Sequence, residues 1–267
     1  MNTVLPTFYI PHGGGPCFFM DGMGPPGTWD GMAAWLRGLP EAVGVKPTAL
    51  LIISAHWEEE QITLNSGANP ELLYDYYGFP PHTYDLKYPA PGAPELAGRV
   101  AQMLKASGIE SRMDSGRGYD HGVFIPFKLI YPDADIPILQ VSLKVGLDPS
   151  FHLQAGKALE PLRSEGVLIV GSGMSYHNLR EFGGEVGAKH AADFDRWLAQ
   201  SVKDLPASER NQNLAQWDKV PSARFAHPRE EHLLPLMVVA GAAGEDVARQ
   251  TYSDKVLGLA ISGFQFG

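Results

Sequence analysis

Hydrophobic residues along this chain fall into short continuous runs separated by longer stretches of mixed polarity. Continuous runs rich in Val, Ile and Leu are typical of strands that are covered on both faces of a sheet. One run alternates more strongly between apolar and polar residues and is a candidate edge strand, at residues 61–65. The full set of predicted strands is 7–10, 49–54, 61–65, 136–143, 167–171 and 257–264.

The stretches between these runs are candidates for helices. Helices are predicted at residues 30–39, 94–106, 149–164, 187–205 and 229–242. Pro94 and Pro149 stand where helix starts tolerate proline. Alternating strands and helices predict an α/β domain with a central, mostly parallel or mixed sheet flanked by helices. Because no linker or low-complexity tract divides residues 1–267, we expect one catalytic domain.

Three of the apolar runs lead into a histidine. His12 follows the first run, His56 follows the second, and His177 follows the 167–171 run after a stretch of small residues. If these runs are parallel strands of one sheet, the three imidazoles emerge at its carboxyl edge, where open α/β sheets bind their ligands. Imidazole is the commonest side-chain metal ligand, so this edge is a candidate active site with a metal.

Two further histidines are candidates for the same site. His232 precedes an apolar stretch and is the best source of a remaining ligand, with Glu230 and Glu231 as nearby carboxylates. His121 follows Asp120, and an adjacent Asp can raise the basicity of an imidazole, but a structural role is equally open. The residues alone also leave open whether His177 is a metal ligand or a general base.

The remaining histidines carry weaker signals. His227, before a proline, is expected to be structural, and His152 and His190 are expected on the surface. His82 could reach the pocket but carries no specific signal.

Composition and motifs restrict the function further. The formal net charge of −9, without a basic patch, argues against nucleic acid or an anionic membrane surface as a partner. No apolar run approaches the length of a membrane span, and no signal peptide is evident, so we expect a cytoplasmic protein. The single cysteine, Cys17, excludes an internal disulfide and is expected to be a structural thiol. The chain has no Gly-x-Ser-x-Gly nucleophile elbow and no His-Glu-x-x-His helix, which disfavours a serine hydrolase and a typical zinc protease.

Eight short segments, taken together, carry a specific pattern along nearly the whole chain. They are HGGGP at 12–16, SAHW at 54–57, YDYYGFP at 74–80, KYPAPG at 87–92, YDHG at 119–122, YPDADIP at 131–137, HNL at 177–179 and EHLLP at 231–235. With these segments the chain resembles the class III extradiol ring-cleavage dioxygenases, in the DOPA-dioxygenase-like branch of the LigB family. One departure is Gly14, where many bacterial relatives have Ser, which affects the loop shape and not the ligand beside it.

The resemblance implies a metal site. His12 and His56 correspond to the first two metal ligands, and His232 corresponds to the third. The protocatechuate branch uses a glutamate at the third position, so Glu230 and Glu231 remain alternatives. The implied active metal is Fe(II), and Zn(II) is a metal that can occupy the same site in purified protein. Three protein ligands on one face leave positions for two catechol oxygens and O₂.

The resemblance also implies catalytic residues and a substrate. His177 corresponds to the acid/base that takes the second phenolic proton and later returns it, and in some members it is a fourth ligand. His121 resembles another histidine of the pocket. The implied substrate is a small aromatic diol, DOPA or a related catechol, which reacts with O₂ to give a semialdehyde. A substrate carboxylate could pair with one of several cations: Lys87, Arg112, Arg117 or Lys144.

Two other functions use the same histidines. A zinc-dependent hydrolase is the alternative enzyme, because a mostly-histidine site binds Zn²⁺ well. A non-catalytic metal- or catechol-binding protein is the third possibility. Oxygen uptake with a catechol distinguishes the dioxygenase from both. The expected oligomeric state is a monomer or a small homo-oligomer.

Overall fold

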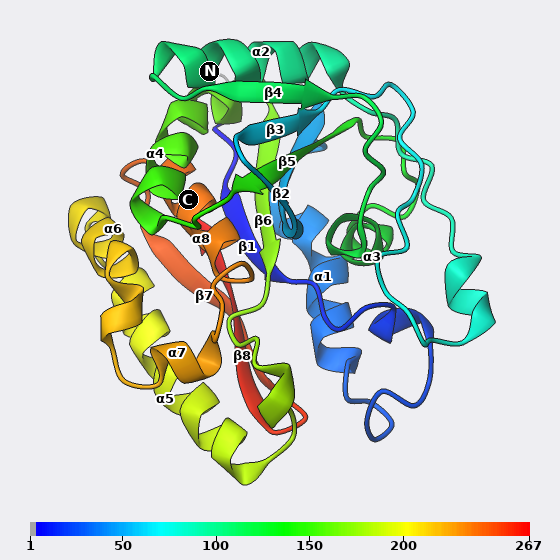
Figure 1. Ribbon diagram of the computed structural model, residues 1–267, viewed down its shortest axis with the longest axis vertical. Helices are drawn as coiled ribbons and strands as arrows, with labels where there is room; N and C mark the ends of the chain where they lie inside the picture. The colour runs from blue at the N-terminus through cyan, green and yellow to red at the C-terminus, as the bar shows by residue number, and fades with distance from the viewer. Residues whose placement is uncertain (1–3) are drawn as a thin grey trace.

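In the computed structural model, which describes residues 4–267, eight strands form one mixed sheet in the order β4-β3-β5-β2-β6-β1-β8-β7 (Figure 1). The central strands β5, β2, β6 and β1 are mutually parallel, whereas β8 runs antiparallel to β1 and β3 antiparallel to β5. The strand bounds are β1 Thr7–Pro11, β2 Ala49–Glu59, β3 Ile62–Asn65, β4 Ser111–Asp114, β5 Ile138–Lys144, β6 Val167–Gly173, β7 Ala248–Val256 and β8 Leu259–Phe266.

Helices cover both faces of the sheet. Helix α8 packs on β6 and β1 with α4 outside it, and α5 packs on β8; α1 and α3 contact each other on the other side (Figure 1). The helix bounds are α1 Asp30–Val43, α2 Pro94–Ala106, α3 His121–Ile130, α4 Pro149–Leu159, α5 Glu185–Val202, α6 Ala207–Ala215, α7 Ala223–Ala226 and α8 Leu234–Ala242. Short 3₁₀ helices are η1 Cys17–Phe19, η2 Pro81–Tyr84, η3 Glu160–Glu165, η4 Leu179–Glu181 and η5 Trp217–Lys219.

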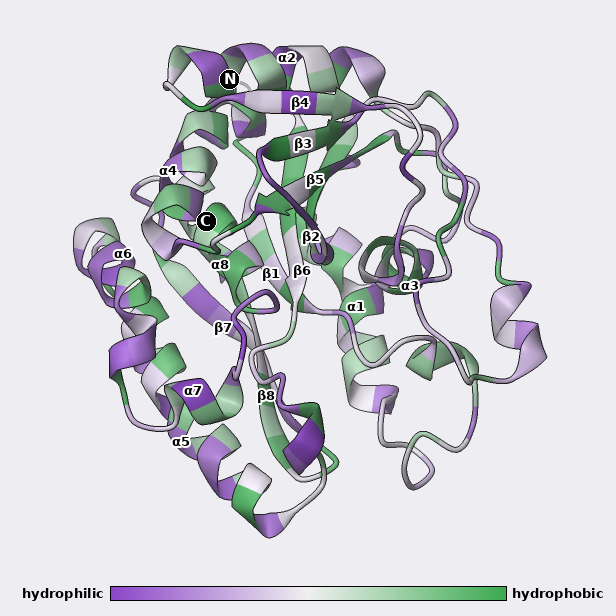
Figure 2. Ribbon diagram, in the orientation of Figure 1, coloured by the Kyte–Doolittle hydropathy of each residue, from purple (hydrophilic) through white to green (hydrophobic). Residues whose placement is uncertain are grey.

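Strands β2, β5 and β6 each begin with a hydrophobic run, as is typical of strands whose two faces are covered (Figure 2). Every residue of β1, β6 and α8 is buried. Across residues 4–267, no helix combines the length and the apolar character that crossing a membrane requires. The core therefore lies along the middle of the sheet, and the polar residues that remain buried there need a specific reason.

The predicted fold class is confirmed. The structure differs from the sequence prediction in the bounds of some strands and in two strands that were not predicted. Strand β2 continues to Glu59, so His56 lies inside the strand and not after it. The predicted edge strand β3 is covered by β4, which was missed. The run at 257–264 is one arm of a hairpin, whose other strand β7 was missed because most of its residues are polar or exposed.

Two helices, α8 and α3, also differ from the sequence prediction. Helix α8 begins at Leu234, so the predicted start at residue 229 was wrong, and residues 229–233 form turns. Helix α3, whose first residue is His121, was not predicted. Nine of the ten residues of α3 are buried, so the segment lacks the polar face by which a surface helix is recognised.

Two glycines of β6 let the segment around the start of α8 approach the sheet closely. A Cβ on Gly171 would lie 2.5 Å from the carbonyl oxygen of Pro235, and a Cβ on Gly173 would lie 2.1 Å from that of His232. The His232 carbonyl is also held by two donors, the hydroxyl of Tyr9 at 2.7 Å and the backbone N–H of Met174 at 3.1 Å. The sequence of β6 therefore fixes where His232 sits over the edge of the sheet.

Replacing Gly173 with alanine is expected to lower the free energy of unfolding by about 1–3 kcal/mol, because the new methyl group must displace backbone rather than a flexible side chain. Urea unfolding of Gly173→Ala measures this loss. Gly98→Ala, in open space on exposed α2, is the control and should instead gain about 0.5–1 kcal/mol. Equal stability of the two variants would contradict the packing described for His232.

Candidate metal centre and active site

Three histidines from distant parts of the chain meet at the carboxyl edge of the sheet. His12 follows β1, His56 lies in β2, and His232 lies in the turn before α8. One ring nitrogen from each lies within 4.8 Å of the others, and the Nε2 atoms of His12 and His56 are 3.0 Å apart. The parallel register of β1, β6 and β2 brings the first two together, since Pro11 pairs with Gly173 and Ser54 with Ser172.

The outer nitrogen of the His12 ring is held by a side chain of β6. Nδ1 of His12 lies 3.1 Å from the hydroxyl of Ser172, and that hydroxyl donates to the carbonyl of Gly122. Because the only hydroxyl proton of Ser172 is already used, its oxygen accepts a hydrogen bond from Nδ1. The Nε2 atom of His12 is then the unprotonated nitrogen of the neutral ring, with a lone pair directed at the cluster.

Glu231 contacts two histidines with one carboxylate oxygen. Its Oε1 lies 2.9 Å from Nδ1 of His232 and 3.2 Å from Nδ1 of His177. Burial alone would raise the pKa of Glu231, but the hydrogen bond from His177 and nearby positive charge hold that pKa below its usual value. An ionised Glu231 accepts from both rings and leaves their Nε2 atoms free.

On the other side of the cluster, the Asp75 carboxylate lies between two histidines, His121 and His56. Its Oδ1 accepts from the backbone N–H of His121 at 2.9 Å and from Nδ1 of that ring at 2.8 Å. Its Oδ2 lies 3.7 Å from Nδ1 of His56. Burial works to raise the pKa of Asp75, but the hydrogen bond and charge of His121 outweigh burial and lower it.

The three converging rings are neutral. Burial, and then the neighbouring imidazoles, lower the pKa of His12 and of His232 well below the ordinary value. The same causes lower the pKa of His56 to about 3. A deprotonated imidazole is the form that binds a metal ion, so burial keeps these side chains ready to act as ligands.

His177 leans over the cluster from the segment that follows β6. Its ring stacks on that of His232, with centroids 3.4 Å apart and planes 17° from parallel. The backbone N–H of His177 donates to Ala226 at 2.9 Å, and the amide of Asn178 donates to the carbonyl of Phe225 at 2.8 Å. These bonds hold the segment against α7, so the Asn178 side chain acts on the backbone and not on the His177 ring.

A cavity of about 460 Å³ opens over the five histidines. Its remaining lining is aliphatic, aromatic or glycine, and it includes two of the four aromatic residues of the YDYYGFP segment, Tyr76 and Phe79. Of the other two, Tyr77 is exposed and Tyr74 packs on Phe124. The lining residues are His12, Gly13, Gly14, Gly15, Met23, Gly24, Trp29, His56, Tyr76, Phe79, His121, Met174, His177, Leu179, Phe182, His232 and Leu257.

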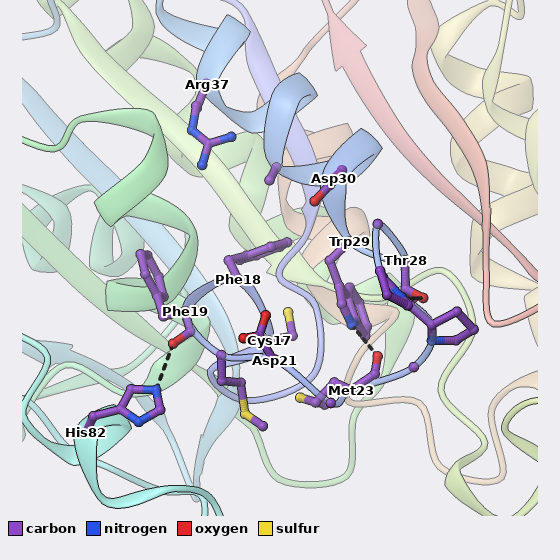
Figure 3. A pocket seen from close by; sticks show the side chains of 17 residues that line it. Cys17, Phe18, Phe19, Asp21, Met23, Thr28, Trp29, Asp30, Arg37 and His82 are labelled. Carbon is purple, nitrogen blue, oxygen red and sulfur yellow. Dashed lines mark hydrogen bonds between the residues drawn. The ribbon is translucent and has the colours of Figure 1, made fainter.

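A second cavity of about 580 Å³ lies beside the loop that joins β1 to α1 (Figure 3). It shares Met23, Gly24 and Trp29 with the first cavity, and the indole of Trp29 donates to the carbonyl of Met23 at 2.8 Å. Arg37 and His82 line this second cavity, but none of the five clustered histidines does. The second cavity is the larger of the two, but it gives no access to the five clustered histidines.

The chain is similar to known proteins over nearly its whole length. The model of the catalytic LigB subunit of aromatic ring-opening dioxygenase matches residues 6–264. The chain belongs to the LigB family. A 4,5-DOPA dioxygenase extradiol of Beta vulgaris is 40% identical over 248 residues, covering 92% of this chain and 89% of that protein. Dioxygenase tasH of Hapsidospora irregularis is 39% identical over 282 residues, covering 99% of this chain and 86% of that protein.

A solved structure also resembles this LigB-family chain. The crystal structure of the uncharacterized protein JW3007 from Escherichia coli K12 matches with a TM-score of 0.77 and 26% sequence identity, over 98% of this chain and 100% of that one. Family membership makes the protein an enzyme of the ring-opening dioxygenase class.

Sequence reasoning missed several residues of this LigB-family site. Asp75 and Ser172 hold ring nitrogens but belong to segments whose partners lie 46 and 160 positions away in the chain. Only the YDYYGFP segment gave a signal for Asp75, and none was available for Ser172. Glu231 was kept as an alternative ligand, and in the structure its carboxylate holds the outer nitrogens of two histidines.

The other histidines lie outside the cluster. His227 is structural, as predicted: it is buried against Trp217 and Phe194, with Nε2 3.0 Å from the carbonyl of Ser175. The surface prediction for His152 was wrong, because it is fully buried and its Nε2 accepts from the backbone N–H of Lys144 at 3.1 Å. His190, also expected on the surface, is partly covered by its stacking on Phe225.

Glu231→Gln is expected to weaken metal binding or turnover by about 10- to 100-fold, because groups that hold the outer nitrogen of a ligating histidine contribute about that much. Glu230→Gln is the matched control, since Glu230 pairs with Arg224 at 2.5 Å and contacts no histidine of the cluster. Competition with a chelator measures the affinity of each variant for the metal. Equal losses in both variants would show that Glu231 does not act through His232.

Proposed function

We propose that this protein is a non-heme Fe(II)-dependent extradiol dioxygenase, with one catalytic domain. It would insert O₂ into a catechol-type ring, that of DOPA or a related catechol, and give a ring-opened semialdehyde. One observation carries the proposal: three neutral imidazoles, two buried and one half-buried, converge beside an apolar cavity in a chain of the ring-opening family. We further propose that it works in the cytoplasm, where Fe(II) and the single free thiol of Cys17 stay reduced.

His12, His56 and His232 would hold the ion. Their donor set fits a divalent transition metal, because three imidazole nitrogens lie within 4.8 Å of one another. Ser172 and Glu231 hold the outer nitrogens of His12 and His232, and the outer nitrogen of His56 faces the Asp75 carboxylate at 3.7 Å. Fe(II), when bound, supplies open positions for the diol oxygens and O₂ and the redox capacity that O₂ chemistry needs. Zn(II) suits the same ligands but has no redox chemistry, so it would fill the site without supporting ring opening.

His177 would be the acid and base of the reaction. With Nδ1 turned to Glu231, its Nε2 is the nitrogen that can take a proton from a diol hydroxyl. The Glu231 carboxylate then stabilises the imidazolium that forms, as a carboxylate does for histidine bases in general. The stack on His232 keeps the ring within reach of a diol at the cluster.

His121 would bind the substrate or O₂ from the opposite side. Because Asp75 occupies its Nδ1, the Nε2 atom is left to meet a group in the cavity. Its ring centroid lies 3.9 Å from that of His56, so this contact would fall next to the cluster.

The proposal is tested by loading the protein with Fe(II) under anaerobic conditions and following O₂ uptake and product absorbance after a catechol is added. We expect stoichiometric O₂ uptake and a yellow product from the iron form, and neither from the zinc form. Absence of uptake by the iron form, with ester hydrolysis by the zinc form, would favour the hydrolase and would contradict the proposal. Catechol binding without any turnover would indicate a binding protein.

A further inference from the structure

The cavity over the histidines lacks a lysine or arginine that could pair with a substrate anion. Among residues 4–267, its lining contains five histidines and no Lys or Arg. The four cations that the sequence offered lie elsewhere: Arg112 pairs with Glu59, Arg117 with Asp120, Lys144 reaches the carbonyl of Val145, and Lys87 is exposed outside the lining. Arg37 lines the second cavity only.

The end of the cavity away from the histidines is an apolar wall. Met23 and Trp29 lie against Gly14, Phe79 lies against Gly15, and Leu257 lies against Gly24. A Cβ on Gly14 would be 3.2 Å from Cε of Met23, and one on Gly24 would be 2.7 Å from Cδ2 of Leu257. These distances show apolar side chains of the cavity lining in contact with the glycine loop.

The charges around the cluster also disfavour an additional anion. The carboxyl groups of Asp75 and Glu231 lie against the histidine rings, 2.8 Å from Nδ1 of His121 and 2.9 Å from Nδ1 of His232. Together they balance the two positive charges of one divalent ion, and a deprotonated diol adds negative charge again. A carboxylate on the substrate would enter this region without a counter-charge, and burying an unpaired carboxylate is costly.

The volume leaves room for an apolar substituent. A cavity of about 150 Å³ accommodates a benzene ring, and this one measures about 460 Å³. The space beyond a diol ring is therefore wide enough for an alkyl or aryl group, whose burial against Met23, Phe79 and Leu257 would add hydrophobic binding energy.

We propose that the preferred substrate is an uncharged catechol with an apolar substituent, and not a catechol that carries a carboxylate. This inference rests on the proposed function and narrows its substrate class to related catechols without a carboxylate, which excludes DOPA itself. The contacts of the substituent would be made by the apolar wall, defined as Met23, Trp29, Phe79, Phe182 and Leu257.

The test compares three catechols of matched length on the iron-loaded enzyme: 4-propylcatechol, 3-(3,4-dihydroxyphenyl)propanamide and 3-(3,4-dihydroxyphenyl)propanoate. Their kcat/KM values come from O₂ uptake, and their Kd values from anaerobic calorimetry. We expect kcat/KM for the alkyl compound to exceed that for the carboxylate by about 100-fold, with the uncharged amide between them. An advantage of the alkyl compound below about tenfold, or about 1.4 kcal/mol, would overturn the inference.

A charge added to the apolar wall supplies a second measurement. Leu257→Arg should lower the ratio of kcat/KM for 4-propylcatechol to kcat/KM for the carboxylate by about tenfold, because a guanidinium in the cavity can pair with the acid. Val247→Arg is the matched control, since Leu257 and Val247 flank β7 at opposite ends and Val247 is exposed outside the cavity. The same narrowing in both variants would overturn the proposed role of the wall.

The outcomes separate the inference from the function beneath it. No O₂ uptake with any of the three catechols would contradict the proposed function itself. Uptake with a preference for the carboxylate would leave the function standing and would assign the anion to other lining groups, such as the backbone N–H groups of Gly13, Gly14 and Gly15.

Discussion

Replacing His12, His56 or His232 with alanine is expected to lower metal affinity by more than about 100-fold, since even partners of a ligating histidine contribute about 10- to 100-fold. Two remaining imidazoles hold a divalent ion weakly, and no other side chain of the described residues brings a ligand atom into that group of three. Metal content after gel filtration, measured by mass spectrometry, should fall to background in each variant.

A matched control separates ligand loss from damage to the fold. His82→Ala removes a histidine that is exposed and reaches only the carbonyl of Phe19, at 3.1 Å, so it should retain full metal content. Circular dichroism of the metal-free proteins checks that each variant is folded. Full metal retention in a folded His12→Ala, His56→Ala or His232→Ala protein would remove that residue from the ligand set.

Replacing His177 with alanine is expected to lower turnover by about 100- to 10,000-fold while metal content stays unchanged, because general acid–base catalysis is typically worth that much. The ring lies outside the group formed by His12, His56 and His232, offers one nitrogen to Glu231 and stacks on His232, which is a suitable arrangement for a base. Single-turnover kinetics with a catechol measure the loss.

Two further measurements make the role of His177 specific. Exogenous imidazole should restore part of the activity of His177→Ala, because the missing ring leaves space beside His232. Loss of metal from the variant would instead identify His177 as an obligatory ligand, and unchanged turnover would remove it from catalysis.

The parallel centre of the sheet could be predicted because its signal is local. The runs before His12 and His56 are continuous and apolar, so strand type, sheet edge and histidine position all follow from a few adjacent residues. His232 is different: it lies in a turn, where the sequence offered it as a remaining ligand without a strand to place it, and the resemblance to the family matched it to the third ligand position. Its position depends on Gly171 and Gly173, which a sequence pattern does not link to a segment about 60 residues later.

The groups around the histidines could not be predicted, for a physical reason. Hydrogen bonds from a ring to Asp75 or Ser172 are set by the packing of distant segments, and polar residues of these types are common in turns and strands without any such role. Hairpin β7–β8 was half missed because β7 exposes most of its side chains. The position of Leu257 in the turn of that hairpin, and so the far end of the cavity, was missed with it.

The part of the molecule that would perform chemistry and the part that would choose the substrate are built differently. The imidazoles are held in place by strands, carboxylates and backbone contacts. Met23, Phe182 and Leu257, in contrast, lie in three loops between helices and strands. Connections of this kind tolerate substitution much better than central strands do. Substitutions in these loops can therefore change which aromatic compound such a protein accepts, while the centre that would handle oxygen stays the same.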